Sequence, residues 1–350
     1  MKQSYIKSDS GNLKEVLRNV SNPDALIMIS NSDQFNEHVD ILKKTFPNVP
    51  SIAGVGHFYG KTIREGGVGL MVLQGVEAVA GLMTHAKDMP VHDIDTLLKN
   101  MSKIGANAAN TVCIDICTGN DAVVLTTMSS ALKKAGVSLI GGTSMDAKVS
   151  ANGEINDDAD AYILIKNKGG RVKVYKENIY RPLDDETFVA SETNKAEYYV
   201  GKLNGRPALD VYKEHLGVGD DAMATQTFTN PLGKITGDDI RIISIREVVG
   251  NGMSFYRQVN DSDILCFLDI KDYKAIVKQT VSEIKSDFSH VSGVISVNCA
   301  FRHILFTQNN FMDQYLDIMS DLGSHCGFVG NGEHFNDQFI NQSMSCVVFE

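Results

Sequence analysis

The chain has 350 residues, of which 43% are hydrophobic, and a formal net charge of −10 with a pI near 5.4. This length exceeds one ordinary domain of roughly 100–200 residues, and the apolar content can fill sizeable cores, so we expect two domains. The excess of acidic residues opposes binding to phosphate backbones and anionic membranes, so we expect neither nucleic acid nor membrane as a partner.

Targeting and metal-binding signals are not apparent. Residues 1–9 contain no apolar run that could act as a signal peptide, and no later segment is apolar over the ~18 residues that span a bilayer. We therefore expect a cytoplasmic protein. The six cysteines lack Cys-x-x-Cys spacing, which argues against a disulfide framework or a zinc ribbon, and the nine histidines lack the spacing of a preformed metal site.

Three stretches of the chain repeat one order of elements. In the first copy, the buried strand 25–29 precedes a helix with an apolar face. The glycine-ended strand 51–56 follows, and after a polar loop comes the strand 68–73. The apolar face of the helix consists of Phe35, Val39, Leu42 and Phe46.

Two further copies follow the same order. The second comprises the strand 112–116, a helix from about 121 to 135, and the strands 138–143 and 161–165. The third comprises the strand 293–297, a helix, and the strands 326–332 and 345–349. The inner face of that third helix is formed by Phe311, Tyr315, Ile318, Met319 and Leu322. A partial fourth copy of the hairpin alone is predicted at 249–252, followed by a strand at 264–268.

Each copy predicts a β-α-β-β unit, with a parallel pair made by a right-handed crossover and an antiparallel strand added by a hairpin. We therefore expect an α/β (mixed α+β) fold of mixed sheets covered by helices, in two halves. The core pattern lapses between Lys176 and Lys195, which suggests a boundary. Beyond it, Pro207 opens a short helix, and the apolar positions from Tyr273 to Phe288 predict another.

The hairpin tips carry the first candidate site. They are rich in glycine, which allows positive φ or close backbone approach. Tips of equivalent hairpins would also gather at one end of the sheets and could bind a small molecule. The candidate ligand-binding side chains at these tips include Thr143, Ser144, Asp146, Asn331 and Glu333.

The segment that follows the first tip, Gly60-Lys61-Thr62, is similar to the end of a phosphate-binding P-loop. A P-loop has a glycine at the position where this chain has Val55, and it opens a helix, whereas this segment is expected to precede a strand. We therefore do not assign nucleotide binding to it.

Residues 298–303 follow an apolar strand, where ligand-binding residues of α/β sheets commonly lie. Cys299 and His303 have the chemistry of a nucleophile and a base, but no third residue that would orient them can be assigned. Arg302 is suited to a carboxylate, either of a ligand or of a structural partner such as Glu333. A single histidine can also hold a haem iron.

Several segments together resemble the FIST sensory domain family. In the C-terminal half the matching segments are 203–209, 298–302, 327–333 and 340–343, and in the N-terminal half the segment 140–144. The resemblance covers nearly the whole chain and implies a FIST N-terminal domain at 1–190 and a FIST C-terminal domain at 191–350.

The resemblance implies an intracellular signal-transduction module that binds small ligands such as amino acids and, in one subfamily, haem that senses nitric oxide. Carried over by position, the residues that match the family are Cys299, Arg302, Gly332, Glu333 and Asn341. The chain departs by His303 after the arginine, and it carries no appended kinase, cyclase or methyl-accepting domain, so we expect output through a separate partner.

Three hypotheses follow. The first is a non-enzymatic sensor of an amino-acid-like ligand that signals to a histidine kinase, a cyclic-dinucleotide enzyme or a chemoreceptor. The second is a haem sensor with His334, His303 or His57 as the axial ligand. The third is a hydrolase-like enzyme that uses Cys299 or Ser144. No cofactor is certain from the sequence, and whether the chain forms a homodimer stays open.

Overall fold

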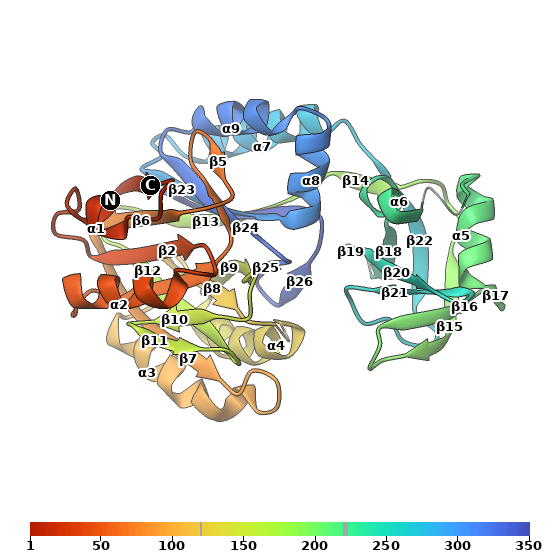
Figure 1. Ribbon diagram of the computed structural model, residues 1–350, viewed down its shortest axis with the longest axis horizontal. Helices are drawn as coiled ribbons and strands as arrows, with labels where there is room; N and C mark the ends of the chain where they lie inside the picture. Colours follow the sequence, from red (N-terminus) through yellow and green to blue (C-terminus); the bar gives the residue numbers. More distant parts are fainter. Residues whose placement is uncertain (120, 220–222, 238) are drawn as a thin grey trace. The chain divides into compact units, whose positions relative to one another are not determined.

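The computed structural model describes residues 1–119, 121–219, 223–237 and 239–350. The chain forms two compact units (Figure 1). Unit 1 comprises Met1–Glu177, Val277–Phe339 and Ser343–Glu350, and unit 2 comprises Asn178–Ile276 and Ile340–Gln342. Unit 1 is therefore built from segments of both halves of the sequence. The domain limits at 1–190 and 191–350 stay a prediction.

The three predicted β-α-β-β units are present in unit 1. In the first, α2 (Phe35–Thr45) connects β2 (Ala25–Ser30) to β3 (Ser51–Val55), and these strands pair in parallel. The third strand, β6 (Val68–Gln74), pairs antiparallel with the other edge of β2. The crossover helix and the mixed sheet are as predicted.

The second and third units repeat this arrangement. In the second, α4 (Asp121–Leu132) and η2 (Lys133–Ala135) lie between the parallel strands β8 (Thr111–Cys117) and β9 (Ser138–Thr143), and β12 (Ala159–Asn167) pairs antiparallel with β8. In the third, β23 (Gly293–Cys299) pairs in parallel with β24 (His325–Gly330) and antiparallel with β27 (Ser343–Phe349). Its crossover contains two helices, α8 (Ala300–Gln308) and α9 (Met312–Ser320), where one was predicted.

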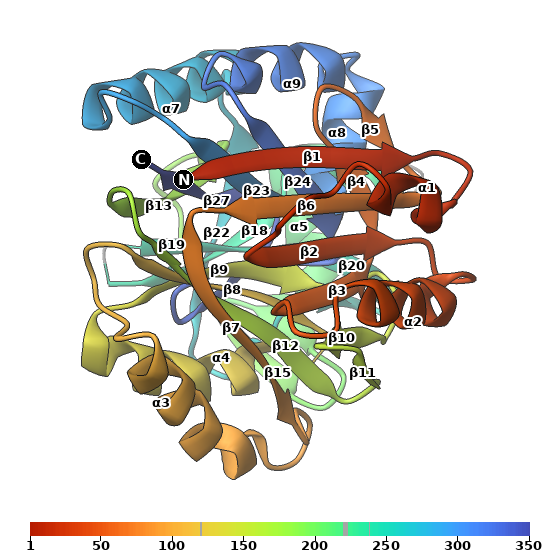
Figure 2. The same ribbon diagram turned by 90° about the vertical axis from the view of Figure 1, so that its left-hand side faces the viewer.

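The strand that follows the glycine-ended strand of each β-α-β-β unit pairs with the sheet of another β-α-β-β unit. After β3, the strand β4 (His57–Tyr59) pairs with β24. After β9, β10 (Val149–Ala151) pairs with β3, and after β24, β25 (Glu333–Phe335) pairs with β9. The exchange closes a cycle among the three sheets, so no unit completes its own sheet. Figure 2 shows β10 beside β3 in the first sheet.

The remaining strands extend these sheets. Their orders are β1-β6-β2-β3-β10-β11, β26-β25-β9-β8-β12-β7 and β13-β27-β23-β24-β4-β5. The added strands are β1 (Lys2–Ser8), β5 (Ile63–Arg64), β7 (Val76–Thr84), β11 (Glu154–Asn156), β13 (Val172–Asn178) and β26 (Gln338–Ile340). The other helices of this part of the chain are α1 (Leu13–Leu17), η1 (Pro90–Asp93), α3 (Ile94–Lys103) and α7 (Tyr273–Asp287).

The first strand of each unit is buried on both faces. In β2, Ile27 and Ile29 belong to a cluster shared by the three sheets, whereas Leu26 and Met28 pack with α1 and α2. Strands covered on both faces read as continuous apolar runs, which is the pattern that identified them. The shared cluster also contains Ile114 and Ile295, so the inner faces of the sheets form one core.

Unit 2 is an antiparallel sheet with two helices in its described residues. The main path of the sheet is β19-β18-β22-β15-β16-β21-β20. Its elements are β14 (Tyr180–Pro182), β15 (Phe188–Asn194), β16 (Tyr199–Leu203), β17 (Arg206–Pro207), α5 (Ala208–Leu216), α6 (Met223–Thr229), β18 (Leu232–Thr236), β19 (Asp239–Ile243), β20 (Ile245–Val249), β21 (Gly252–Phe255) and β22 (Ile264–Ile270).

The hairpin and the strand predicted as a partial fourth copy are both present, but they belong to the antiparallel sheet of unit 2. The hairpin at 249–252 joins β20 to β21, and β22 pairs with β14, β15 and β18 rather than with that hairpin. Glycine-ended strands arise in antiparallel hairpins as well as in the repeated unit, so the local pattern alone did not distinguish them. The predicted helices after Pro207 and from Tyr273 are confirmed as α5 and α7.

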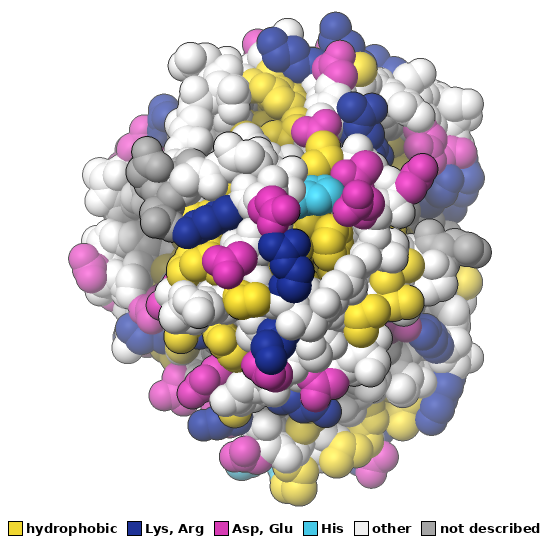
Figure 3. All heavy atoms as spheres, turned by 90° about the vertical axis from the view of Figure 1, so that its right-hand side faces the viewer, with side chains coloured by type: hydrophobic (Ala, Val, Ile, Leu, Met, Phe, Trp, Pro, Cys, Tyr) yellow, Lys and Arg dark blue, Asp and Glu magenta, His cyan; other side chains and the backbone are white. Residues whose placement is uncertain are grey.

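Surface charge is mixed on the face drawn in Figure 3. Lys and Arg side chains alternate there with Asp and Glu side chains, and hydrophobic side chains lie between them. In the described part of the chain, no helix combines the length and apolar character needed to cross a membrane.

Gly141 tests how tightly β8 and β9 pack. A Cβ atom at this position would collide with the side chain and the carbonyl oxygen of Asp115. We expect Gly141→Ala to lower the free energy of unfolding by about 1–3 kcal/mol, because overpacking forces the strands apart. Urea denaturation measures this change. Gly66→Ala is the matched control, since nothing lies within 4 Å of its added Cβ, and an equal loss in both variants would contradict the packing argument.

Candidate functional site

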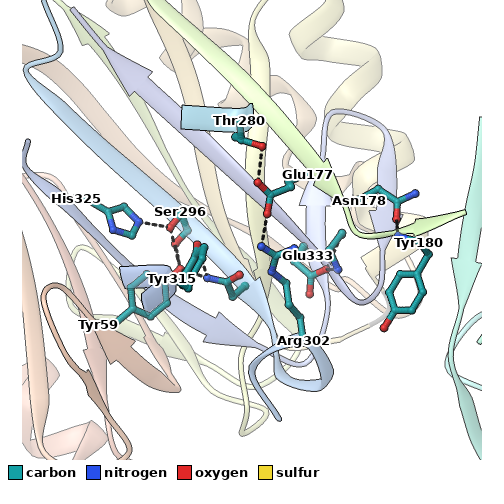
Figure 4. A network of polar contacts seen from close by, with 12 residues as sticks. Tyr59, Glu177, Asn178, Tyr180, Thr280, Ser296, Arg302, Tyr315, His325 and Glu333 are labelled. Atoms are coloured by element: carbon teal, nitrogen blue, oxygen red, sulfur yellow. Dashed lines mark hydrogen bonds and ion pairs between the residues drawn. The ribbon is translucent and has the colours of Figure 1, made fainter. Parts of the chain in front are cut away.

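Arg302 lies in the first turn of α8, directly after β23, and its side chain is fully buried. Its Nη2 donates to Oε1 of Glu177, from the end of β13. The hydroxyl of Thr280, on α7, donates to the other oxygen of Glu177 (Figure 4). Burial alone would lower the pKa of the Arg302 guanidinium, but the charge of Glu177 and the hydrogen bond to it raise that pKa. The guanidinium of Arg302 is therefore held in its charged form.

The guanidinium of Arg302 has hydrogen-bond donors that Glu177 does not engage. Its Cζ lies 4.5 Å from the ring centroid of Phe306 and 5.5 Å from that of Tyr315, so aromatic faces stabilise the charge. Its Nε and Nη1 have no hydrogen-bond partner among the described residues. A buried donor without a partner costs about 1–3 kcal/mol, so this arrangement is expensive unless something else accepts from it.

Glu333 lies at the start of β25, and its carboxyl is fully buried. It accepts hydrogen bonds from the backbone nitrogen of Ser343 at 3.2 Å and from the hydroxyl of Ser343 at 2.9 Å. Burial raises the pKa of Glu333 to about 8, although Ser343, Cys299 and the charge of Arg302 act in the opposite direction. At neutral pH this carboxyl is therefore mainly protonated.

A chain of buried hydrogen bonds leads from this region to the start of β24. Asn298 donates to the hydroxyls of Tyr315, at 3.0 Å, and Tyr59, at 2.8 Å. Tyr59 contacts the hydroxyl of Ser296 at 2.9 Å, and Ser296 contacts Nε2 of His325 at 2.7 Å. Figure 4 shows His325, Ser296, Tyr59 and Tyr315 close together. The ring of Tyr315 therefore links this chain to Arg302.

A second buried cluster surrounds His334 on β25. Its Nδ1 lies 2.7 Å from Oδ2 of Asp115, and its Nε2 lies 2.9 Å from Oδ1 of Asp121. Burial would lower the pKa of His334, but these two carboxylates raise it well above its usual value. Burial and the nearby Asp115 raise the pKa of Asp160 well above its ordinary range. We read the cluster as an imidazolium held between two carboxylates.

The hairpin tips meet, but they satisfy one another's backbone groups. Thr143 donates its N–H to the carbonyl of Gly332 at 3.0 Å, and Asn331 donates its N–H to the carbonyl of Thr143 at 3.0 Å. The Ser144 hydroxyl contacts the N–H of Val55 at 3.0 Å. These contacts connect the tips to one another, and the Thr143 hydroxyl also donates to Asp121. A role of Thr143, Ser144, Asn331 and Gly332 in ligand binding stays a prediction.

Cys299 and Ser144 lie in different surroundings. Cys299 is buried at the N-cap of α8 and acts as a hydrogen-bond partner of Glu333. The Ser144 hydroxyl is also bonded to the carbonyl of Lys148 at 2.9 Å. Neither side chain is placed as an exposed nucleophile beside a base, which a hydrolase would need.

Asn341 is described within unit 2, as part of its segment Ile340–Gln342. It is buried, and its Oδ1 has no hydrogen-bond partner among the described residues. The adjacent Gln342 donates from Nε2 to the carbonyl of Thr227 at 2.7 Å.

The three candidate haem ligands differ in the availability of their nitrogens. Both ring nitrogens of His334 are taken by carboxylates, so this residue does not suit an axial ligand. The rings of His57 and His303 lie 5.9 Å apart, and the Nδ1 of each lacks a partner within the described chain. Burial and the neighbouring His57 lower the pKa of His303, which favours the neutral, ligating form.

Sequence reasoning missed Glu177, Asp115, Asp121 and Asp160. Glu177 is 125 residues away from Arg302 in the chain, at the edge of the stretch where the core pattern lapses. Asp115 was visible as a charge inside an otherwise apolar strand, and a charge there demands a buried partner. The position of Asp115 in an apolar strand therefore indicates that it has a buried partner, but it does not identify that partner as His334.

The pH dependence of stability should report the unusual state of Glu333. Its folded pKa of about 8 exceeds its ordinary value of 4.5, so its stabilising contribution is complete below about pH 4.5 and is lost as the pH rises to about 8. The slope is at most about 1.4 kcal/mol per pH unit. We expect the free energy of unfolding, measured in urea between about pH 5 and pH 8, to fall less steeply in Glu333→Gln.

His334 contributes a loss in the same direction above about pH 6.5, since its pKa is also raised, but it does so in both proteins and cancels in the difference. Parallel curves for the wild type and Glu333→Gln would show that Glu333 is ionised in the folded protein at neutral pH.

Two family models match the chain. A family model described as the FIST N domain matches residues 24–206, and one described as the FIST C domain matches residues 208–336. A search of curated proteins finds no match. FIST domains are associated with sensory signal transduction and ligand binding, which is consistent with the expectation of a non-enzymatic protein. The chain, with both domains represented in succession, belongs to the FIST family of sensory proteins.

Proposed function

We propose that the protein senses a small amino-acid-like ligand, with Arg302 binding the ligand carboxylate. The observation that carries this proposal is the buried guanidinium, whose Nε and Nη1 have no partner in the described residues although Nη2 is paired with Glu177. A carboxylate can accept from two guanidinium nitrogens at once, and such charge-assisted bonds are among the strongest in proteins.

Glu333 would bind the amino group of the ligand. Its carboxyl is near enough to Arg302 for their charges to interact, and its pKa is about 8. A ligand ammonium group beside it would stabilise the ionised carboxylate and lower that pKa. An α-amino acid thus offers one group for Arg302 and another for Glu333, and its binding would release a proton at neutral pH.

Because the site is buried, ligand binding requires a structural change, and that change can be the signal. Arg302, Glu177 and Glu333 are each at most 2% exposed, so a ligand reaches them only if the surrounding elements move. A ligand that binds the open and closed arrangements differently shifts the population between them. The change is then read by a separate signalling protein, for which we propose a histidine kinase, a cyclic-dinucleotide enzyme or a chemoreceptor.

Isothermal titration calorimetry with the common L-amino acids tests this function. For a ligand that binds, we expect release of up to one proton near pH 7, seen as a binding enthalpy that depends on the ionisation enthalpy of the buffer. Glu333→Gln should remove this dependence because its side chain cannot titrate.

A matched control is Glu192→Gln, which changes an exposed carboxylate that pairs with Lys202 in unit 2. Binding with no buffer dependence in the wild type would contradict the role of Glu333. Failure of all the amino acids to bind would contradict the proposed ligand class.

A second candidate is a haem-based sensor of nitric oxide, favoured by the unpartnered nitrogens of His57 and His303. Either imidazole would hold the iron, and the haem would supply the gas-binding chemistry. The two residues come from β4 and α8 and so connect two units of the repeat.

The haem proposal predicts a Soret band when the protein is titrated with haem, which shifts after reduction and exposure to nitric oxide. The band should be lost in the double variant His57→Ala/His303→Ala and kept in His290→Ala, whose side chain is exposed. A band that survives the double variant rules out these ligands, and no band in the wild type rules out the cofactor.

A further inference from the structure

A pocket of about 370 Å³ lies in unit 1, and neither Arg302 nor Glu333 is among the residues that line it. It is bordered by β1, by the turn between β4 and β5, and by the connection from α9 to β24. The lining residues include Tyr5, Lys7, Lys61, Thr62, Ser324 and His325. The segment 60–62, which is similar to the end of a P-loop, thus forms one wall as a hairpin turn rather than as the start of a helix.

Two residues that line the pocket each carry a buried polar atom with no partner in the part of the chain that the structure describes. These atoms are the hydroxyl oxygen of Tyr5 and Nδ1 of His325. His325 is 92% buried, since its exposed fraction is 8%, and its other nitrogen is held by Ser296 at 2.7 Å. Buried polar groups are almost always hydrogen-bonded, so both atoms point to a missing partner.

The electrostatics of the pocket favour a negative ligand. Lys61 is exposed at the rim and has no ion-pair partner in the described residues, and Lys7 contributes a second ammonium group. Lys7 also contacts Asp9 at 3.0 Å, but Asp9 is not among the residues that line the pocket. Lys61 and Lys7 thus give the pocket a local positive charge, although the chain as a whole has a net charge of −10.

The geometry points to a binding site for a small organic anion, whose carboxylate or phosphate group lies between Lys61 and Lys7 and accepts hydrogen bonds from Tyr5 and His325. Both anionic groups suit ammonium and hydroxyl donors, and the volume accommodates a molecule of metabolite size. This site is separate from the Arg302 site, and its test uses residues that do not belong to that site.

His325 connects the pocket to the interior. Burial lowers its pKa to about 3, so the ring is neutral and carries one proton on either nitrogen. An anion that accepts from Nδ1 selects the tautomer protonated there, and Nε2 must then accept from the hydroxyl of Ser296. The hydroxyl of Tyr59 then has to donate to Ser296, and Asn298, which donates to Tyr59, also donates to Tyr315 beside Arg302.

The test is titration of the ¹⁵N-labelled full chain with inorganic phosphate and, separately, with acetate at constant ionic strength set by chloride. We expect the His325 ring nitrogens to shift toward the Nδ1-protonated tautomer with saturable binding. Lys61→Gln should weaken binding by roughly two- to fivefold, the effect of one partly exposed charge contact.

Tyr5→Phe removes only the unpartnered hydroxyl, so it should keep the fold and also weaken binding. Lys87→Gln is the control, because Lys87 is exposed and does not line the pocket. Saturation by phosphate alone assigns a phosphorylated ligand, and saturation by acetate alone assigns a carboxylate. Shifts no larger than those with chloride, or equal binding by Lys61→Gln, Tyr5→Phe and the wild type, would overturn the site.

Discussion

The exchange of hairpins among three sheets is the constraint on which unit 1 depends. Because β4, β10 and β25 each complete the sheet of another unit, the three β-α-β-β units cannot form their sheets independently. The exchange also carries side chains across unit boundaries. His334 reaches Asp115 in the second unit only because β25 pairs with β9, and the same strand brings Glu333 close to Arg302. The buried polar clusters are therefore consequences of the topology.

These clusters suggest how a stable core can also respond to a ligand. Buried ion pairs add little net stability, yet removal of one partner is costly, so such pairs select one arrangement of the chain over others. Arg302 is held by Glu177 and two aromatic rings but keeps nitrogens without a partner. In the function that we propose, a ligand completes this arrangement, and the energy of that completion drives the change that a partner reads.

The repeat could be predicted from the sequence because β2, β8 and β23 are buried on both faces, which produces mainly apolar runs before glycine-ended strands. The exchange of hairpins could not be predicted, because a strand such as β10 has only three residues and its local sequence does not indicate which strand it pairs with. Arg302 was predicted to need a carboxylate, and Glu333 was suggested. The structure instead pairs it with Glu177, whose distance along the chain hides the contact. His334 was a candidate haem ligand because its position is visible in sequence, whereas the two carboxylates that occupy its nitrogens are not.

The most direct test of the account is the Nε–H resonance of Arg302, followed by ¹⁵N NMR during titration with L-amino acids and with the matching amines that lack a carboxylate. A carboxylate that accepts from Nε should move this resonance downfield with saturation, and the amine should leave it unchanged. If an amino acid binds without moving the Arg302 resonance, or if the amine moves it equally, the guanidinium does not recognise the ligand carboxylate and the central claim is wrong.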